Sequence, residues 1–223
     1  MSHTFVHTAD HATASRQARR RWAVYRDGTA LAVAGGLVFQ ALHALEHLVQ
    51  LAMWLVHPLA PPYLTPWAIV GRDGLAMVAG STGAGGEVLH LIGNLIFLAA
   101  LLGLHLVDAT DARLGVRPPS LSRERAVKGA TVMQTVHVME HLMLTAAVVL
   151  TGTPLGMSNL FGLLEAGTPS ATALRVLFHF TLNAVPTILV GKALWTTAPW
   201  NTRRPRPVGR PTPHPDLVDQ ARM

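Results

Sequence analysis

Residues 40–47 read QALHALEH, and residues 134–141 read QTVHVMEH. Each octapeptide lies inside a run of apolar residues, 30–56 in the first case and 130–150 in the second. Ionisable side chains at the centre of a membrane-spanning helix cost roughly 2.5–3.5 kcal/mol each on insertion scales. Because the pattern Gln-x-x-His-x-x-Glu-His carries this cost twice, we expect a duplicated polar site inside a membrane protein.

The composition also favours a membrane protein. Half of the 223 residues are hydrophobic, 13% are charged, and the mean hydropathy is +0.33. A helix needs about 20 apolar residues to cross the hydrocarbon core of a bilayer. Four runs reach that length: 30–56, 87–107, 130–150 and 172–195. The sequence therefore predicts an all-α integral membrane protein whose four spans form a four-helix bundle.

Basic residues are distributed unevenly between these runs. Arginine is frequent before the first span, between the second and third, and after the fourth, whereas only Arg72 and Arg175 lie in or near the other two connections. Cytoplasmic segments of membrane proteins carry an excess of Lys and Arg. We therefore expect both termini in the cytoplasm of a bacterial cell, with the bundle in its cytoplasmic membrane. Clustered arginine of this kind faces solvent or anionic lipid, so we expect no nucleic-acid partner.

The repeat extends to the second span of each half. The second and fourth spans contain His90-x-x-x-Asn94 and His179-x-x-x-Asn183. Because the first and third spans both run outward, the halves are predicted to be parallel two-helix repeats related by an axis along the membrane normal.

The chain accordingly divides into five segments. These are a loosely ordered cytoplasmic arm (1–28), the first repeat (29–109), a cytoplasmic loop (110–128), the second repeat (129–200) and a disordered tail rich in Pro and Arg (201–223). Two short apolar stretches, Trp67–Val78 and Leu160–Leu164, interrupt the outer loops. We expect them to cap the outer mouth of the bundle.

The spacing within each octapeptide predicts a metal site. Residues three and four apart share one face of a helix, so each octapeptide presents its glutamine and both histidines as a stripe, with the glutamate beside it. The absence of cysteine excludes thiolate sites and iron–sulfur clusters. The predicted ligands are His43, Glu46, His47, His90, His137, Glu140, His141 and His179. Gln40, Asn94, Gln134 and Asn183 are expected to orient the imidazoles by hydrogen bonding.

This donor set suits two transition-metal ions, iron first, with copper or zinc as alternatives, and does not suit calcium or magnesium. Two histidines and one carboxylate in each half are compatible with non-haem iron and oxygen chemistry. We therefore expect an oxidoreductase in which Glu46 and Glu140 also move protons. Its substrate would be a small apolar or amphiphilic molecule from the bilayer, and a separate protein would donate electrons. Glu87 and Arg175, at the outer mouth, are expected to pair with each other.

Other functions fit parts of the pattern. The order His-x-x-Glu-His is also that of the inverzincin peptidases, which predicts an intramembrane zinc hydrolase as the second hypothesis. Paired histidines in a membrane bundle can also bind haem for electron transfer, although a haem iron needs no adjacent glutamate. A metal or proton transporter with His–Glu relays is a further alternative. Finally, buried His and Gln can serve only as hydrogen-bond partners between helices.

Overall fold

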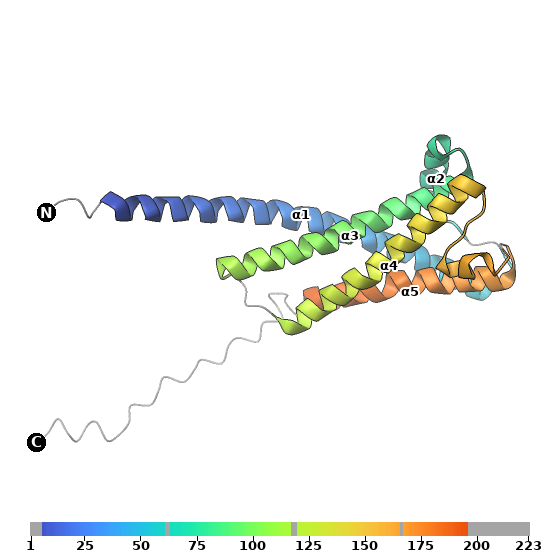
Figure 1. Ribbon diagram of the computed structural model, residues 1–223. Coiled ribbons are helices and arrows are strands. Elements are labelled where there is room, and N and C mark those ends of the chain that lie inside the picture. The colour runs from blue at the N-terminus through green and yellow to red at the C-terminus, as the bar shows by residue number, and fades with distance from the viewer. Residues whose placement is uncertain (1–5, 61–62, 117–119, 166, 196–223) are drawn as a thin grey trace, which may run out of the picture.

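Four long helices form a bundle in the computed structural model, which describes residues 6–60, 63–116, 120–165 and 167–195 (Figure 1). They are α1 (Val6–Val56), α3 (Thr82–Leu114), α4 (Leu121–Thr151) and α5 (Pro169–Trp195). A shorter helix, α2 (Pro66–Ala79), and a 3-10 helix, η1 (Met157–Gly162), lie in the connections at one end. The predicted all-α bundle is confirmed. The predicted tail, 201–223, lies outside the described residues.

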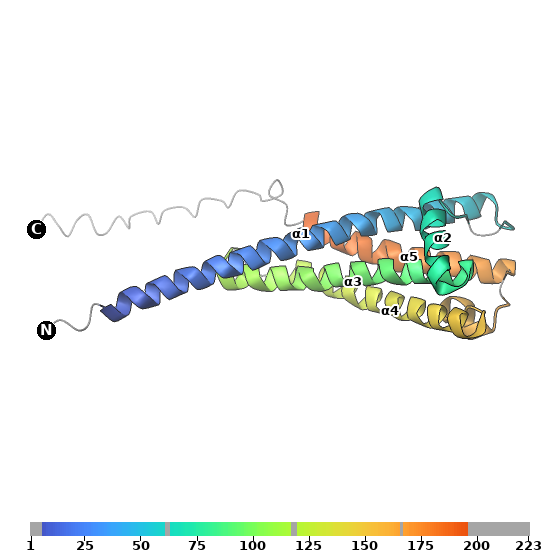
Figure 2. The ribbon, with the colours of Figure 1, turned by 90° about the horizontal axis from the view of Figure 1, so that it is seen from above.

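Each long helix packs against two others, so the four close a ring. α1 contacts α3 and α5, and α4 contacts the same two helices. Figures 1 and 2 show α1 continuing well past the end of α3. We call the end with α2 and η1 the loop end, and the end where α1 begins and α5 stops the terminal end.

The bundle has the surface of a membrane protein. All four long helices are long and apolar enough to cross a bilayer, and their most apolar windows have mean hydropathies of 1.3 to 2.0. Large apolar side chains project outward, among them Leu31 (76% exposed) and Leu42 (59% exposed). Water-soluble monomers rarely expose apolar side chains so continuously. Hydrocarbon is the solvent that suits this surface, so the chain is an integral membrane protein.

The helices extend beyond the apolar runs that predicted them. α1 begins at Val6, so the segment predicted to be a loosely ordered arm is helical from that residue, and this part of the prediction was wrong. α3 continues to Leu114 and α4 starts at Leu121, both inside the predicted loop. Hydropathy marks where a chain meets lipid, whereas Ala, Arg and Gln are strong helix formers in water too.

Ion pairs explain why the helices stay together at the terminal end. Arg26 of α1 donates to Asp111 of α3 over 2.6 Å. The buried Arg123 of α4 binds both carboxylate oxygens of Asp108, at 2.8 to 3.1 Å, and donates to the Ala193 carbonyl of α5 at 3.2 Å. Bidentate arginine–carboxylate contacts are strong and geometrically specific. Toward the middle of the bundle an apolar core follows, built from Val33, Phe97, Leu101, Leu104, Val127, Ala130, Val190 and Ala193.

At the loop end, α2 crosses α3 in close contact at Gly85. A Cβ atom on this residue would overlap the carbonyl oxygen of Arg72 and would lie 2.6 Å from the backbone nitrogen of Ala76. Backbone atoms cannot move aside as a flexible side chain can. We expect Gly85→Ala to lower the free energy of unfolding by about 1–3 kcal/mol and to loosen α2.

Hydrogen–deuterium exchange of residues 66–79 in detergent, together with the melting temperature, would measure this effect. Gly74→Ala is the matched control, because nothing lies within 4 Å of a Cβ atom there. Equal exchange in both variants would contradict close packing at Gly85.

Candidate metal centre

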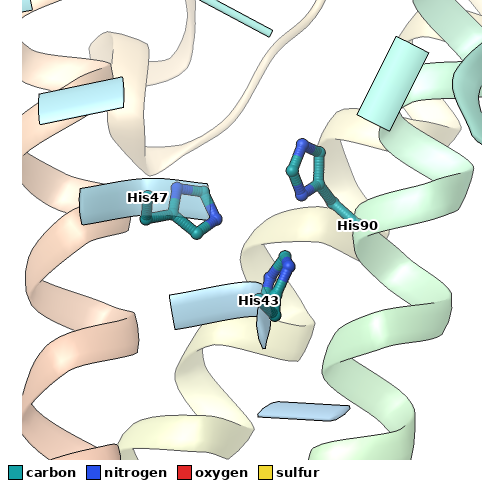
Figure 3. Close-up of side chains that lie close together, drawn as sticks. All are labelled: His43, His47 and His90. Atoms are coloured by element: carbon teal, nitrogen blue, oxygen red, sulfur yellow. The ribbon is translucent and has the colours of Figure 1, made fainter. Parts of the chain in front are cut away.

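Six histidines, contributed by all four long helices, lie together in the half of the bundle nearer the loop end. They form two groups, and within each group one ring nitrogen per residue lies within 4.8 Å of the others. The first triad is His43 and His47 of α1 with His90 of α3; the second triad is His137 and His141 of α4 with His179 of α5. Figure 3 shows the rings of the first triad close together. The structure thus brings together every histidine that the sequence analysis selected.

The two triads adjoin each other and form one cluster. The ring centroids of His90 and His141 are 5.2 Å apart, and those of His47 and His179 are 6.1 Å apart. Corresponding pairs of rings in the two triads have similar centroid separations. His43–His47 measures 4.8 Å and His137–His141 measures 5.0 Å. His43–His90 measures 5.4 Å and His137–His179 measures 5.7 Å.

Many ring nitrogens of the cluster are buried without a hydrogen-bond partner in the described part of the chain. They are Nε2 of His43, His47 and His179, Nδ1 of His90, and both ring nitrogens of His137 and His141. The great majority of buried polar atoms in proteins have a partner, and an exception calls for an explanation such as a bound ion. Imidazole nitrogens are good ligands for zinc, copper, iron and nickel. The cluster therefore fits transition-metal binding.

The two glutamates of the octapeptides bind the outer loops. The Glu46 carboxylate accepts hydrogen bonds from the Thr65 backbone N–H (3.2 Å), from the Thr65 hydroxyl and from the Gln50 amide (3.3 Å). The Glu140 carboxylate accepts from the backbone N–H groups of Met157 (2.6 Å) and Ser158 (3.0 Å). Within the described ranges, the groups able to share an ion contain histidine only. A ligand role for Glu46 and Glu140 stays a prediction.

The four carboxamides predicted to orient the imidazoles form a layer on the terminal side of the triads. Gln40 of α1 donates to Asn183 of α5 (3.2 Å), and Gln134 of α4 donates to Asn94 of α3 (2.8 Å). Each asparagine in turn donates to the backbone carbonyl of the histidine four residues earlier, at 2.9 Å in both cases. The amides thus hold the histidine-bearing helices together. No hydrogen bond joins them to a ring nitrogen in the described residues.

With this geometry established, comparison with known proteins identifies the family. Residues 3–206 match the family described as "Family of unknown function (DUF6008)". The chain belongs to that family. Comparisons of this DUF6008 chain with the curated proteins and with the solved structures gave no match.

In this DUF6008 protein, the predicted pairing of Glu87 with Arg175 at the outer mouth is confirmed, and Glu87 also lies beside the histidine cluster. The Arg175 guanidinium donates to one oxygen of Glu87, and the other oxygen lies 3.4 Å from Nδ1 of His141. The Arg175 carbonyl lies 2.8 Å from Nδ1 of His179, which makes Nδ1 the protonated nitrogen and leaves Nε2 free. Glu87 is only 6% exposed. Its contact with the second triad was not predicted from the sequence, although its position three residues before His90 places it on the same face of α3.

A cavity of about 280 Å³ connects the histidines of this DUF6008 protein with the loop end. His47, His90, His141 and His179 line its inner part. Its outer part is bounded by residues of the loops and of α5, including Leu64, Pro154, Asn159, Ala171, Arg175 and Val176. Pro154 and Asn159 lie on either side of Met157 and Ser158, whose backbone N–H groups donate hydrogen bonds to Glu140. The loop conformation therefore shapes the access to the cluster.

Proposed function

We propose that this DUF6008 chain is a membrane metalloprotein that holds two transition-metal ions, one in each histidine triad, and acts as an oxidoreductase. The unpartnered ring nitrogens of six adjoining, largely buried imidazoles carry the proposal. If the triads held no ion, or if the imidazoles were protonated, these nitrogens would stay without a partner. Each unsatisfied buried polar group costs about 1–3 kcal/mol of stability. Two bound ions would satisfy one nitrogen of each ring.

The sequence pattern placed iron first among the possible metals. A site of three imidazoles for each ion favours copper more strongly than that pattern did. The octapeptides predict a carboxylate ligand beside each histidine pair, a combination that is typical of non-haem iron. Both carboxylates are hydrogen-bonded to the loops instead. Copper forms the most stable complexes of the divalent first-row metals with nitrogen donors, and imidazole also suits iron. Either metal, when bound as an adjacent pair, supplies one-electron redox chemistry that zinc lacks.

The protein's own residues would select and position the substrate. The cavity above the histidines is walled by apolar side chains such as Leu64 and Val176 and by the polar residues Gln50, Asn159, Thr172 and Arg175. Pockets of this character hold small, largely apolar molecules and orient them with a few polar contacts. A small amphiphilic molecule entering from the loop end is the substrate class that fits.

The two half-sites differ in one respect. Glu87 lies beside the second triad, whereas the corresponding position three residues before His179 is Val176. Carboxylates that face a ligating histidine fix its tautomer and raise its basicity. The second triad therefore has a carboxylate oxygen 3.4 Å from one of its rings, and the two ions would sit in unequal surroundings.

We infer, in addition, that α1 with α3 and α4 with α5 are two parallel repeats whose termini are cytoplasmic. The paired ring separations support this inference. So does the reciprocal pairing of the amides, because the glutamine of each half binds the asparagine of the other.

The other functions find less support in the geometry. A zinc hydrolase needs a carboxylate that is free to activate water, and Glu46 and Glu140 both bind backbone N–H groups. A haem lies between its two axial imidazoles, whereas the rings of this cluster contact one another at centroid separations of 4.8 to 6.1 Å. Transporters commonly use broken helices at their sites. Here α1, α3, α4 and α5 run continuously through the cluster.

Elemental analysis of the full chain, purified in mild detergent after growth with added copper and iron, would test the proposal. We expect about two copper or iron atoms per chain, and a redox titration that shows a metal-centred change. Absence of any bound transition metal would overturn the metalloprotein proposal. Two zinc ions, with no redox response, would overturn the oxidoreductase part alone.

A further inference from the structure

A groove runs along the surface between α1 and α3, on the terminal side of the histidines. It consists of two adjoining hollows that share Tyr25. The hollow at the terminal end, about 810 Å³, is lined by polar, basic and aromatic side chains that include Arg21, Trp22 and Arg113. The second hollow, about 610 Å³, is lined mostly by small and apolar residues.

Small side chains create the apolar part of the groove. A Cβ atom on Gly36 would lie 2.6 Å from the Cβ of Ala100, and one on Gly103 would lie 2.7 Å from a methyl group of Val33. The two helices therefore touch almost backbone to backbone. Beside this contact, a Cβ atom on Gly28 would have no other atom within 4 Å. Glycines and alanines cannot fill the space next to the contact, which leaves an elongated apolar channel.

The terminal end of the groove carries two cations that have no acidic partner in the described part of the chain. Arg26 is paired with Asp27 and Asp111. Arg21 and Arg113 make no ion pair with a described residue, and both side chains are exposed. The Arg113 guanidinium stands 6.0 Å from the Trp22 ring, which in turn meets Tyr25 edge-on. Tryptophan and tyrosine concentrate at the level of lipid headgroups.

The length of the groove matches one leaflet of a membrane. Arg21 and Gly36 are fifteen residues apart on one helix. At a rise of 1.5 Å per residue, this separation is roughly 22 Å. A bilayer with its headgroups is about 40–45 Å thick, so one leaflet measures about 20–22 Å. A basic, aromatic end and an apolar channel thus lie one lipid length apart.

We propose that this groove binds one anionic glycerophospholipid. Its phosphate lies between Arg21 and Arg113, and an acyl chain occupies the channel beside Gly28, Ala32 and Gly36. Anionic headgroups are attracted to juxtamembrane arginines, and guanidinium groups bind phosphate in a bidentate manner. The lipid would fill the groove between α1 and α3 on the side of the bundle where α1 extends past the end of α3. This site is independent of the metal centre.

Lipid retention by the detergent-purified full chain, measured by native mass spectrometry, would test the site. The probes are phosphatidylglycerol and phosphatidylcholine with identical acyl chains. We expect the wild-type chain to retain one phosphatidylglycerol in preference to phosphatidylcholine. The double variant Arg21→Gln/Arg113→Gln should weaken phosphatidylglycerol binding about tenfold to thirtyfold. Arg20→Gln/Arg125→Gln is the control, because it removes the same charge outside the groove and should leave binding unchanged.

A second variant tests the channel without touching the charges. Gly28→Leu fills open space, so the chain should fold normally and retain less of both lipids. Equal retention of the two lipids by the wild-type chain would overturn the proposal. Unchanged phosphatidylglycerol binding in the double variant would also overturn it. A protein dimer that Gly28→Leu disrupts would assign the groove to a second copy of the chain instead.

Discussion

Replacing His47 and His141 together by alanine is expected to leave the purified protein without stoichiometric transition metal. Each substitution removes one imidazole from one triad, and two remaining imidazoles hold an ion far more weakly than three. The single variants His47→Ala and His141→Ala should each keep about one ion per chain if each triad binds one ion. Elemental analysis, normalised to protein by amino-acid analysis, measures this series.

His105→Ala is the matched control for the loss of an imidazole. His105 lies outside both triads, and its Nε2 contacts the Thr131 hydroxyl at 3.1 Å. This variant should bind the full complement of metal. Full metal content in the double variant would contradict the assignment of the triads as ligands.

The same series has a second readout that does not depend on metal analysis. An ion that binds only the folded chain stabilises it by a free energy that grows with the logarithm of the ion concentration relative to Kd, so added metal should raise the melting temperature of the wild-type chain. The double variant should show no such rise. Without metal it should be about as stable as the wild-type chain, because the substitutions remove buried nitrogens that have no hydrogen-bond partner among the described residues.

Replacing Glu140 by glutamine is expected to release the loop that contains η1 and to leave the metal in place. A carboxylate can accept from both Met157 and Ser158, whereas the amide of glutamine has a single acceptor oxygen and would turn its NH2 group toward a backbone N–H. Loss of a buried hydrogen bond to a charged group costs about 1.5–3 kcal/mol. The loop also contains Leu160 and Phe161 at φ values of 51° and 55°. Such left-handed conformations are unfavourable, so they persist only while the surrounding contacts hold them.

Hydrogen–deuterium exchange of residues 153–164, measured beside metal content, separates the two roles considered for Glu140. Fast exchange with retained metal would identify the carboxylate as a loop anchor. Loss of metal with unchanged exchange would identify it as a ligand. Glu165→Gln removes a neighbouring exposed carboxylate and should change neither quantity. Gly156→Ala should reproduce the effect on the loop, because its Cβ would lie 2.7 Å from Oε1 of Glu140.

The duplicated octapeptide predicted the core of the candidate site for a clear physical reason. Ionisable residues in apolar runs are expensive, so their spacing is informative, and it led directly to His43, His47, His137 and His141. The partner motifs added His90 and His179. Hydropathy likewise located the four long helices, because lipid contact requires a continuous apolar surface.

The parts that could not be predicted depend on contacts with little sequence signature. Glu46 and Glu140 lie on the same faces as the histidines, but their partners include backbone N–H groups of distant loops, which any residue provides. Beyond the apolar runs, α1 is joined to α3 by the pairing of Arg26 with Asp111, residues 85 positions apart. Glu87 could be assigned to the mouth, but its approach to His141 required the register of α3 against α4.

The layer of paired carboxamides closes the histidine cluster on its terminal side. Below the paired carboxamides the helices are filled by side chains such as Phe97 and Leu101, both fully buried. Among the described residues this packing leaves no open path from the terminal end to the imidazoles, whereas the cavity under the loops reaches four of them. In the proposed function, metal, substrate and product would therefore all enter and leave at the loop end, whatever the concentration of metal on the other side of the membrane.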